Sequence, residues 1–144
     1  MKTKIGLVII LVFAIMQIIP FQEEIEIPDD AVDFFAEIDA PQDLQLLIQE
    51  TCYDCHSNQT KMPWYGEIAP ISWWIKDHIE HGRKHLDFSN WSAYSQKQKA
   101  HKMEECYEEL EEQNMPLYSY TIMHGNAKFS EEQTAKLVSF FKEL

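Results

Sequence analysis

The sequence predicts an all-α protein. Apolar residues recur at intervals of three and four in several segments, as they do along one face of a helix. No stretch alternates apolar and polar residues in the manner of a strand, and proline or serine stands where several helices would begin. With 144 residues, the chain has room for one small domain behind a short N-terminal segment.

Residues 1–20 have the form of an export signal. Lys2 and Lys4 make a basic start, and an almost unbroken apolar run of fifteen residues follows from position 5 to position 19. This run is shorter than the about 20 residues that a spanning helix needs, and no small-residue cleavage site follows it. We expect an uncleaved anchor rather than a cleaved signal, with the domain on the periplasmic side of the inner membrane.

The next segment, residues 21–40, is acidic and contains a proline, so we expect a tether in which Phe34 and Phe35 contact the domain. The domain itself is expected over residues 41–144. Pro41 suits the first turn of a helix. Leu44, Leu47, Ile48, Thr51 and Cys52 then recur at helical spacing. The first cysteine of the chain therefore lies on the apolar face of this helix.

A pentapeptide at the end of that helix carries the clearest chemical signal. Cys52-Tyr53-Asp54-Cys55-His56 has the C-x-x-C-H spacing of c-type haem attachment. The two thiols can each add to one vinyl group of the porphyrin, and the imidazole that follows can bind the iron. We therefore expect one haem, held covalently through Cys52 and Cys55, with His56 as an axial ligand.

Three other interpretations use the same residues. A thioredoxin-like redox pair should open a helix, whereas this pair closes one. A zinc site would need a fourth ligand, such as Cys106 or a histidine. A disulfide within the pentapeptide would close a very short loop and leave His56 without a role.

An aromatic loop and a second helix follow. Trp64 and Tyr65 are candidates to cover a haem edge, although packing on protein would explain them equally well. Pro70 begins the helix, and Gly82 is expected to loosen or end it. Arg83 is a candidate partner for the haem propionates, with a solvated side chain as the alternative.

Three histidines share one side of the helix: His78, His81 and His85. They are candidates for a second metal site or a distal haem ligand, or are ordinary surface residues.

A strongly polar helix is expected from about position 95 to position 113. Met115-Pro116 follows and prevents the helix from continuing, because a residue before proline avoids helical geometry. Met115 is the candidate for the sixth iron ligand, since its neutral thioether favours ferrous iron. A methionine in the core is the alternative. Weaker candidates for the same role are Met62, Met103, Met123 and His124.

The last segment begins with a capping box, in which the Ser130 hydroxyl and the Gln133 side chain satisfy free backbone donors. Its apolar face is expected to dock on the helix that follows Pro41. Four Trp, six Tyr and eight Phe are consistent with aromatic packing on a porphyrin or in an ordinary core.

The charge of the chain narrows the range of partners. Twenty-four Asp and Glu against 12 Lys and Arg make a formal net charge of −12. Nucleic-acid binding needs a basic surface and is therefore not expected. An acidic surface also disfavours adhesion to anionic lipid, but it can steer a basic redox partner.

Together these residues resemble the small bacterial haem-binding domain proteins, a family related to c-type cytochromes. The likeness runs from about Pro28 to the C-terminus. Its motifs, in order, are Cys52-Tyr53-Asp54-Cys55-His56-Ser57-Asn58, Pro63-Trp64-Tyr65, Ile68-Ala69-Pro70-Ile71-Ser72-Trp73, Gly82-Arg83, Phe88-Ser89, Trp91, Met115-Pro116-Leu117, Tyr120 and His124. Asp87 and Gly125 depart from it, where asparagine and proline are usual.

This resemblance implies a cytochrome c-like helical domain around one covalent haem, preceded by an N-terminal hydrophobic helix. Cys52 and Cys55 would be the thioether sites, His56 the proximal ligand and Met115 the distal one. The two departures affect only local loop geometry.

We expect an electron carrier rather than an enzyme, anchored in the membrane through its N-terminal helix and served by a redox partner protein. One alternative is a peroxidase-like haem enzyme or ligand sensor with an open sixth position and a distal His78 or His124. The other is a zinc or thiol redox module that adds Cys106 to the pentapeptide. The sequence predicts neither the oligomeric state nor the identity of the partner.

Overall fold

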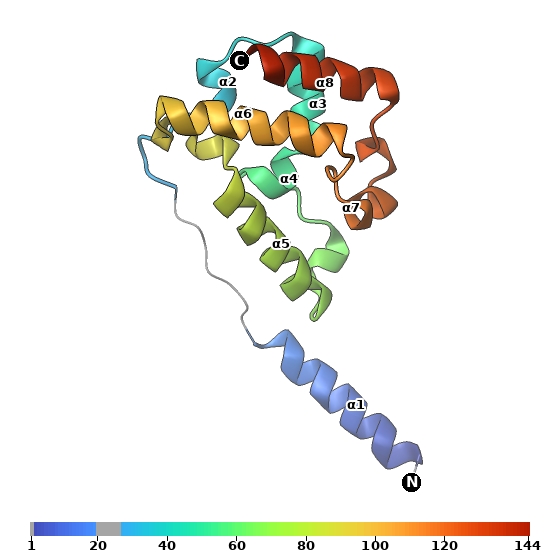
Figure 1. Cartoon of the computed structure of the whole chain (residues 1–144). Coiled ribbons are helices and arrows are strands. Elements are labelled where there is room, and N and C mark those ends of the chain that lie inside the picture. The colour runs from blue at the N-terminus through green and yellow to red at the C-terminus, as the bar shows by residue number, and fades with distance from the viewer. Residues whose placement is uncertain (1, 20–26) are drawn as a thin grey trace.

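The computed structural model describes residues 2–19 and 27–144, and within them every regular element is a helix (Figure 1). The prediction of an all-α protein is confirmed. In chain order the elements are α1 (Lys2–Gln17), α2 (Phe34–Glu37), α3 (Gln42–Thr51), α4 (Tyr53–His56), η1 (Trp64–Glu67), α5 (Ile71–His85), η2 (Phe88–Ala93), α6 (Gln96–Glu111), α7 (Tyr118–Met123), η3 (Gly125–Ala127) and α8 (Glu131–Glu143).

Helix α1 points away from the other helices and has no buried residue (Figure 1). Its C-terminal end contacts the domain. The Gln17 side chain donates to the carbonyl oxygen of Ala69 at 3.1 Å and accepts from the Ala69 N–H at 3.0 Å. Within residues 2–19 and 27–144, no helix combines the length and the apolar character needed to cross a membrane. The last residue of the predicted anchor, and residues 21–26 of the predicted tether, lie outside the described residues.

The second half of the predicted tether belongs to the core. Phe34 has no exposed surface, and its ring lies 4.9 Å from that of Trp91 and 5.1 Å from that of Phe88. Asp33 caps α2 by accepting from the Phe35 N–H, and the same oxygen accepts from the Tyr53 hydroxyl, each at 3.0 Å. The segment before α3 is thus fixed to the helical turn that holds the two cysteines.

Local signals set the starts of the long helices. Pro41 and Pro70 directly precede α3 and α5, as predicted. The capping box of Ser130 and Gln133 forms at the start of α8. A second one, with Ser95 at the N-cap, starts α6. In each box two backbone donors that have no partner inside the helix are satisfied.

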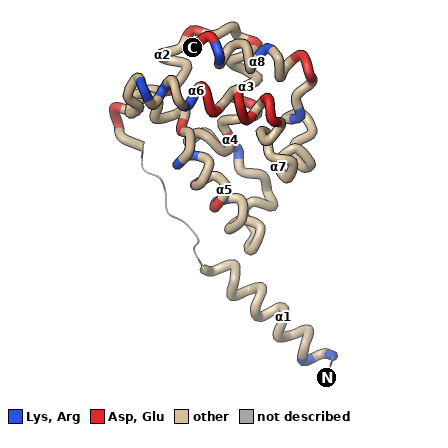
Figure 2. The backbone as a smooth tube through the Cα atoms, in the orientation of Figure 1, with Lys and Arg blue, Asp and Glu red and all other residues tan. Residues whose placement is uncertain are grey.

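The two C-terminal long helices, α6 and α8, pack along one another and close one side of the domain (Figure 1). The prediction named the helix after Pro41 as the docking partner of α8, and Leu137 of α8 and Ile48 of α3 do share one core. The prediction did not include α6, which packs most extensively on α8. Helix α6 carries much of the negative charge of the domain (Figure 2).

Candidate functional site

A cavity of about 500 Å³ lies inside the domain, between α4, α5, α6 and the chain segment that leads into α7. This volume falls in the range of roughly 300–1,000 Å³ found for ligand pockets. Residues far apart in the sequence meet in its lining, among them Cys52, Cys55, His56 and Met115. The four residues predicted to hold a haem most directly therefore face one space.

The pentapeptide forms a separate helical turn, α4, directly after α3. The N–H groups of Cys55 and His56 both donate to the Cys52 carbonyl oxygen, at 3.2 and 3.0 Å. Residues three apart on a helix share a face, and both thiol-bearing residues line the cavity. The turn is held at its outer side by Asp54, whose carboxylate accepts from the Lys61 N–H at 2.9 Å and the Tyr120 hydroxyl at 2.7 Å.

The imidazole of His56 is oriented by the backbone of α5. Its Nδ1 lies 3.0 Å from the carbonyl oxygen of Gly82 and 3.1 Å from that of Leu86. Since both partners are acceptors, Nδ1 carries the proton and the lone pair is on Nε2. Burial lowers the pKa of His56 and favours this neutral form. A neutral imidazole, held by a backbone acceptor at one nitrogen and free at the other, is the form that binds a metal.

Gly82 allows α5 to approach that closely. A Cβ atom at this position would lie 2.6 Å from the carbonyl oxygen of Cys55, a distance too short for any real contact. Helix α5 continues through Gly82 to His85, so the prediction that this glycine loosens or ends the helix is wrong. Its role is to bring two backbones together.

The three cysteines, Cys52, Cys55 and Cys106, are all free thiols. Burial is the main cause that raises the pKa of Cys52 to about 12 and that of Cys55 to about 11. Burial likewise raises the pKa of Cys106, which lines the same cavity. A thioredoxin-like pair works through a stabilised thiolate, which is the opposite effect. Among the described residues, no three His, Cys, Asp or Glu side chains are arranged to hold a metal ion by themselves.

Two kinds of side chain in the cavity could serve as a further iron ligand. Of the methionines in the described part of the chain, Met115 alone lines it. The segment of Met115 is fixed to the end of α6 by its N–H, which donates to the Glu109 carbonyl oxygen at 3.2 Å. The other kind is imidazole, because three histidines of α5 also line the cavity: His78, His81 and His85. His124 does not; its Nδ1 lies 3.1 Å from the carbonyl oxygen of Tyr120.

Three predicted haem contacts lie elsewhere. Trp64 and Tyr65 are in η1, outside the cavity lining, and Trp64 is 78% exposed. The guanidinium of Arg83 binds the Asp87 carboxylate through Nε and a terminal nitrogen, each at 3.0 Å, and both side chains are more than nine-tenths buried. Their contact with haem stays a prediction. Asp87, one of the departures from the family pattern, is thus half of a buried ion pair.

Lys102 of α6 lines the cavity but was not among the site residues predicted from the sequence. It is the one Lys or Arg in the cavity lining given by the described residues, and its Nζ lies 2.7 Å from a carboxylate oxygen of Glu105. Lys102 is one of three lysines in α6, with Lys97 and Lys99, so composition does not single it out. Only the tertiary structure, in which α6 and the pentapeptide turn line the same cavity, identifies it.

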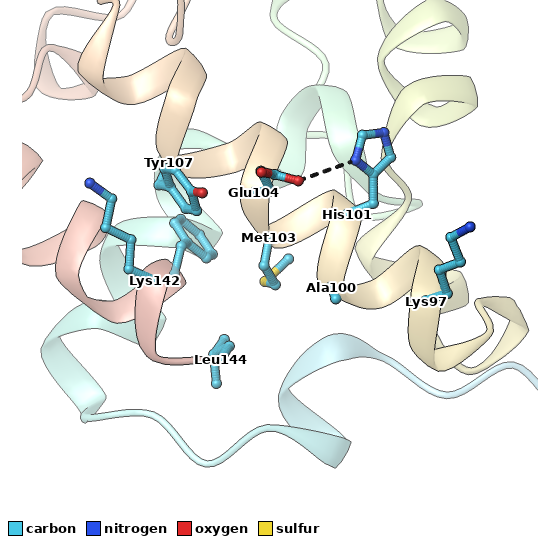
Figure 3. A pocket seen from close by; sticks show the side chains of 9 residues that line it. Lys97, Ala100, His101, Met103, Glu104, Tyr107, Lys142 and Leu144 are labelled. Atoms are coloured by element: carbon cyan, nitrogen blue, oxygen red, sulfur yellow. Dashed lines mark ion pairs between the residues drawn. The ribbon is translucent and has the colours of Figure 1, made fainter.

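A second hollow, of about 440 Å³, lies between α6 and the C-terminal end of α8 (Figure 3). Its lining includes Met103, a weaker candidate for the sixth iron ligand, but none of Cys52, Cys55, His56 and Met115. His101 pairs with Glu104 at 3.7 Å along one rim, and Lys142 lies over the Tyr107 ring at 4.9 Å on the other (Figure 3). His101, Glu104 and Lys142 in its lining already interact with neighbouring side chains.

Comparison with known proteins gives one result. The chain matches the family described as the haem-binding domain over residues 11–143, which is most of its length. No curated protein and no solved structure matches it.

Proposed function

Because the chain belongs to the haem-binding domain family, we propose that it is an exported electron carrier, anchored through α1, that holds one covalently attached haem. The observation that carries this proposal is the convergence of Cys52, Cys55, His56 and Met115 on a single cavity. The three residues of the C-x-x-C-H motif come from one helical turn, and the methionine from a segment about sixty positions further on.

The cavity lining fits a porphyrin in its chemistry. Large apolar side chains make up much of the wall: Leu86, Phe88, Leu110, Leu117, Phe129, Leu137 and Phe141. Cys52 and Cys55 would form the two thioether bonds, and His56 would bind the iron through Nε2. The backbone of α5 keeps that nitrogen unprotonated and limits rotation of the ring. When bound, the haem supplies a one-electron couple between ferric and ferrous iron.

Lys102 is the candidate partner for a haem propionate. It contributes a cation to a lining whose other charged groups include Asp77, Glu105 and Glu109. Its side chain is 17% exposed, so the interaction with a carboxylate would be only partly screened by water. Arg83, the candidate that the sequence suggested for this role, does not line the cavity, and its contact with a propionate stays a prediction.

Export and anchoring complete the proposal. Lys2 and Lys4 precede the apolar body of α1, in the order that keeps the N-terminus inside and places the domain outside. Export is consistent with covalent haem, since bacterial c-type haem is attached outside the inner membrane.

A second function is favoured by one specific observation. Met115 is 36% exposed, and three histidines of α5 share its cavity. If the methionine is displaceable, or does not bind, an added ligand could reach the iron beside an imidazole. A haem-based ligand sensor or a peroxidase-like enzyme is therefore the second candidate.

Expression of the full chain with and without the c-type haem maturation machinery tests the main proposal. We expect the intact mass to increase by one haem only when the machinery is present, and a pyridine haemochrome spectrum of the c type. The variant Cys52→Ala/Cys55→Ala should show neither signal, whereas Cys106→Ala should show both. Absence of the added mass in the unmutated protein would refute covalent attachment.

A further inference from the structure

The end of the domain nearest to α1 carries three exposed apolar side chains. Trp64 is 78% exposed, Ile71 46% and Trp74 49%. Trp64 begins η1, and the other two lie in the first turn of α5, against which η1 packs. Tryptophan, with an apolar ring and one N–H group, is enriched where lipid chains meet water.

The apolar helix ends at the same place. Gln17, the last residue of α1, binds both the N–H and the carbonyl oxygen of Ala69. Ala69 lies between η1 and α5, five positions after Trp64 and two before Ile71. The paired hydrogen bonds thus join the end of α1 to the segment between η1 and α5, the two elements that carry the three exposed side chains.

The charge distribution favours lipid as the partner of this surface. Residues 68–75 contain no Lys, Arg, Asp or Glu, whereas acidic side chains gather along α6 (Figure 2). An anionic membrane repels acidic surfaces. The uncharged start of α5 is therefore a part of the domain that can lie against the bilayer.

The length of α1 supports the same conclusion. Its 16 residues rise about 24 Å, which is less than the hydrocarbon thickness of about 30 Å. A short inserted helix draws flanking residues toward the membrane interface. We propose that Trp64, Ile71 and Trp74 form a membrane-facing surface that seats the domain on the lipid headgroups beside inserted α1. This inference rests on the anchoring part of the proposed function and not on its haem.

Contact of this surface with the lipid headgroups would fix the distance of the haem cavity from the membrane. The ring of Trp74 lies 4.4 Å from that of His78, and the cavity lining begins on α5 with Asp77 and His78. The cavity therefore starts one helical turn beyond the membrane-facing surface. Docking holds it close to the bilayer, where a membrane-bound redox partner can reach it.

Photolabelling of the full-length haem-loaded protein tests the inference. The protein is reconstituted into vesicles of phosphatidylethanolamine and phosphatidylglycerol that contain a lipid with an aryl diazirine near its headgroup. Trypsin cleaves after Lys61 and Lys76, so segment 62–76 is released as one peptide with all three side chains. Because no Lys or Arg separates α1 from α3, a parallel digest with a glutamate-specific protease releases residues 38–50, which contain Leu46 of α3, as a separate peptide. We expect labelling within α1 and in segment 62–76, the latter at least fivefold above that of α3, which also exposes a leucine, Leu46.

Three variants make the result specific. Trp64→Ser/Trp74→Ser should reduce labelling of segment 62–76 to the level of α3, while Leu46→Ser should leave it unchanged. Trp64→Ser alone should give intermediate labelling of segment 62–76. Because Trp64 is 78% exposed, this variant should stay folded, which its haem spectrum will show. Labelling confined to α1 would overturn the inference and leave the anchor intact. Absence of label from α1 would overturn both the inference and the anchor, and haem content measured on the same sample reports on the haem proposal separately.

Discussion

The Nδ1 atom of His56 lies 3.0 Å from the carbonyl oxygen of Gly82, so the backbone of α5 orients the imidazole that α4 presents to the cavity. A backbone acceptor cannot move away as a side chain can, and it fixes both the tautomer and the direction of Nε2. The contact depends on the absence of a side chain at position 82, where α5 touches the backbone of Cys55. One glycine therefore determines how the ring of His56 is held.

Substitution of that glycine should damage the site. The Cβ atom of Gly82→Ala would meet the Cys55 carbonyl oxygen at 2.6 Å, and one of the two backbones would have to shift. We expect a loss of about 1–3 kcal/mol in the free energy of unfolding, as is typical of overpacking, and a lower yield of haem-loaded protein. Gly125→Ala is the matched control, because no atom lies within 4 Å of its Cβ position. Equal denaturant midpoints for the two variants would contradict this account.

Covalent attachment should leave one thiol available. The chain has three cysteines, and thioether formation would consume Cys52 and Cys55. Iodoacetamide added to the unfolded haem-loaded protein should therefore add a single group, at Cys106. Mass spectrometry of the alkylated chain gives the number of added groups. The haem-free protein, unfolded and treated in the same way, is the control and should take up three groups.

The thiols of the folded haem-free protein should react slowly. Burial and the nearby Asp54 raise the pKa of Cys55 from its usual 9 to about 11, so at pH 8 it has about 100-fold less thiolate than an unfolded chain. Its alkylation rate should rise about tenfold per pH unit up to pH 11, whereas the rate in urea should level off above pH 9. Because the raised pKa favours the neutral thiol in the native state, this group's contribution to stability should be lost as the pH rises from 9 through 11.

Met115 should be the sixth ligand if the protein is an electron carrier. The ferric protein is then expected to show a near-infrared sulfur-to-iron charge-transfer band, and Met115→Ala should lose it and bind carbon monoxide rapidly when reduced. Met123→Ala is the control, since this exposed methionine of α7 lies outside the cavity lining. Rapid carbon monoxide binding by the unmutated protein would instead support the sensor or enzyme alternative.

The ion pair of Arg83 and Asp87 should matter for stability. Both side chains are more than nine-tenths buried, and Asp87 also caps η2 by accepting from the Ser89 N–H at 3.0 Å. Removal of one partner of a buried pair costs about 3–5 kcal/mol, so Asp87→Ala should lower the denaturant midpoint strongly. Lys136→Ala, which breaks an exposed pair with Glu132 at the same spacing, should produce no measurable change.

Local chemistry made much of the fold predictable. Pro41, Pro70, Ser95 and Ser130 each stand at the start of a long helix, because capping and proline geometry act within a single turn. The short elements α2, η1, η2 and α7 were not predicted. Each is too short to form by its own propensity, and contacts such as that of Phe34 with Trp91 hold α2 in place.

The sequence by itself determined the attachment turn. In Cys52 to His56, the thiol spacing and the imidazole that follows are set by neighbouring positions, and the match to the haem-binding domain family agrees with this reading. Only the tertiary structure decided which distant side chains face the turn. Met115 and Lys102 line the cavity while Arg83 pairs with Asp87, since helix packing, and not position in the chain, sets which sides of α5 and α6 turn inward.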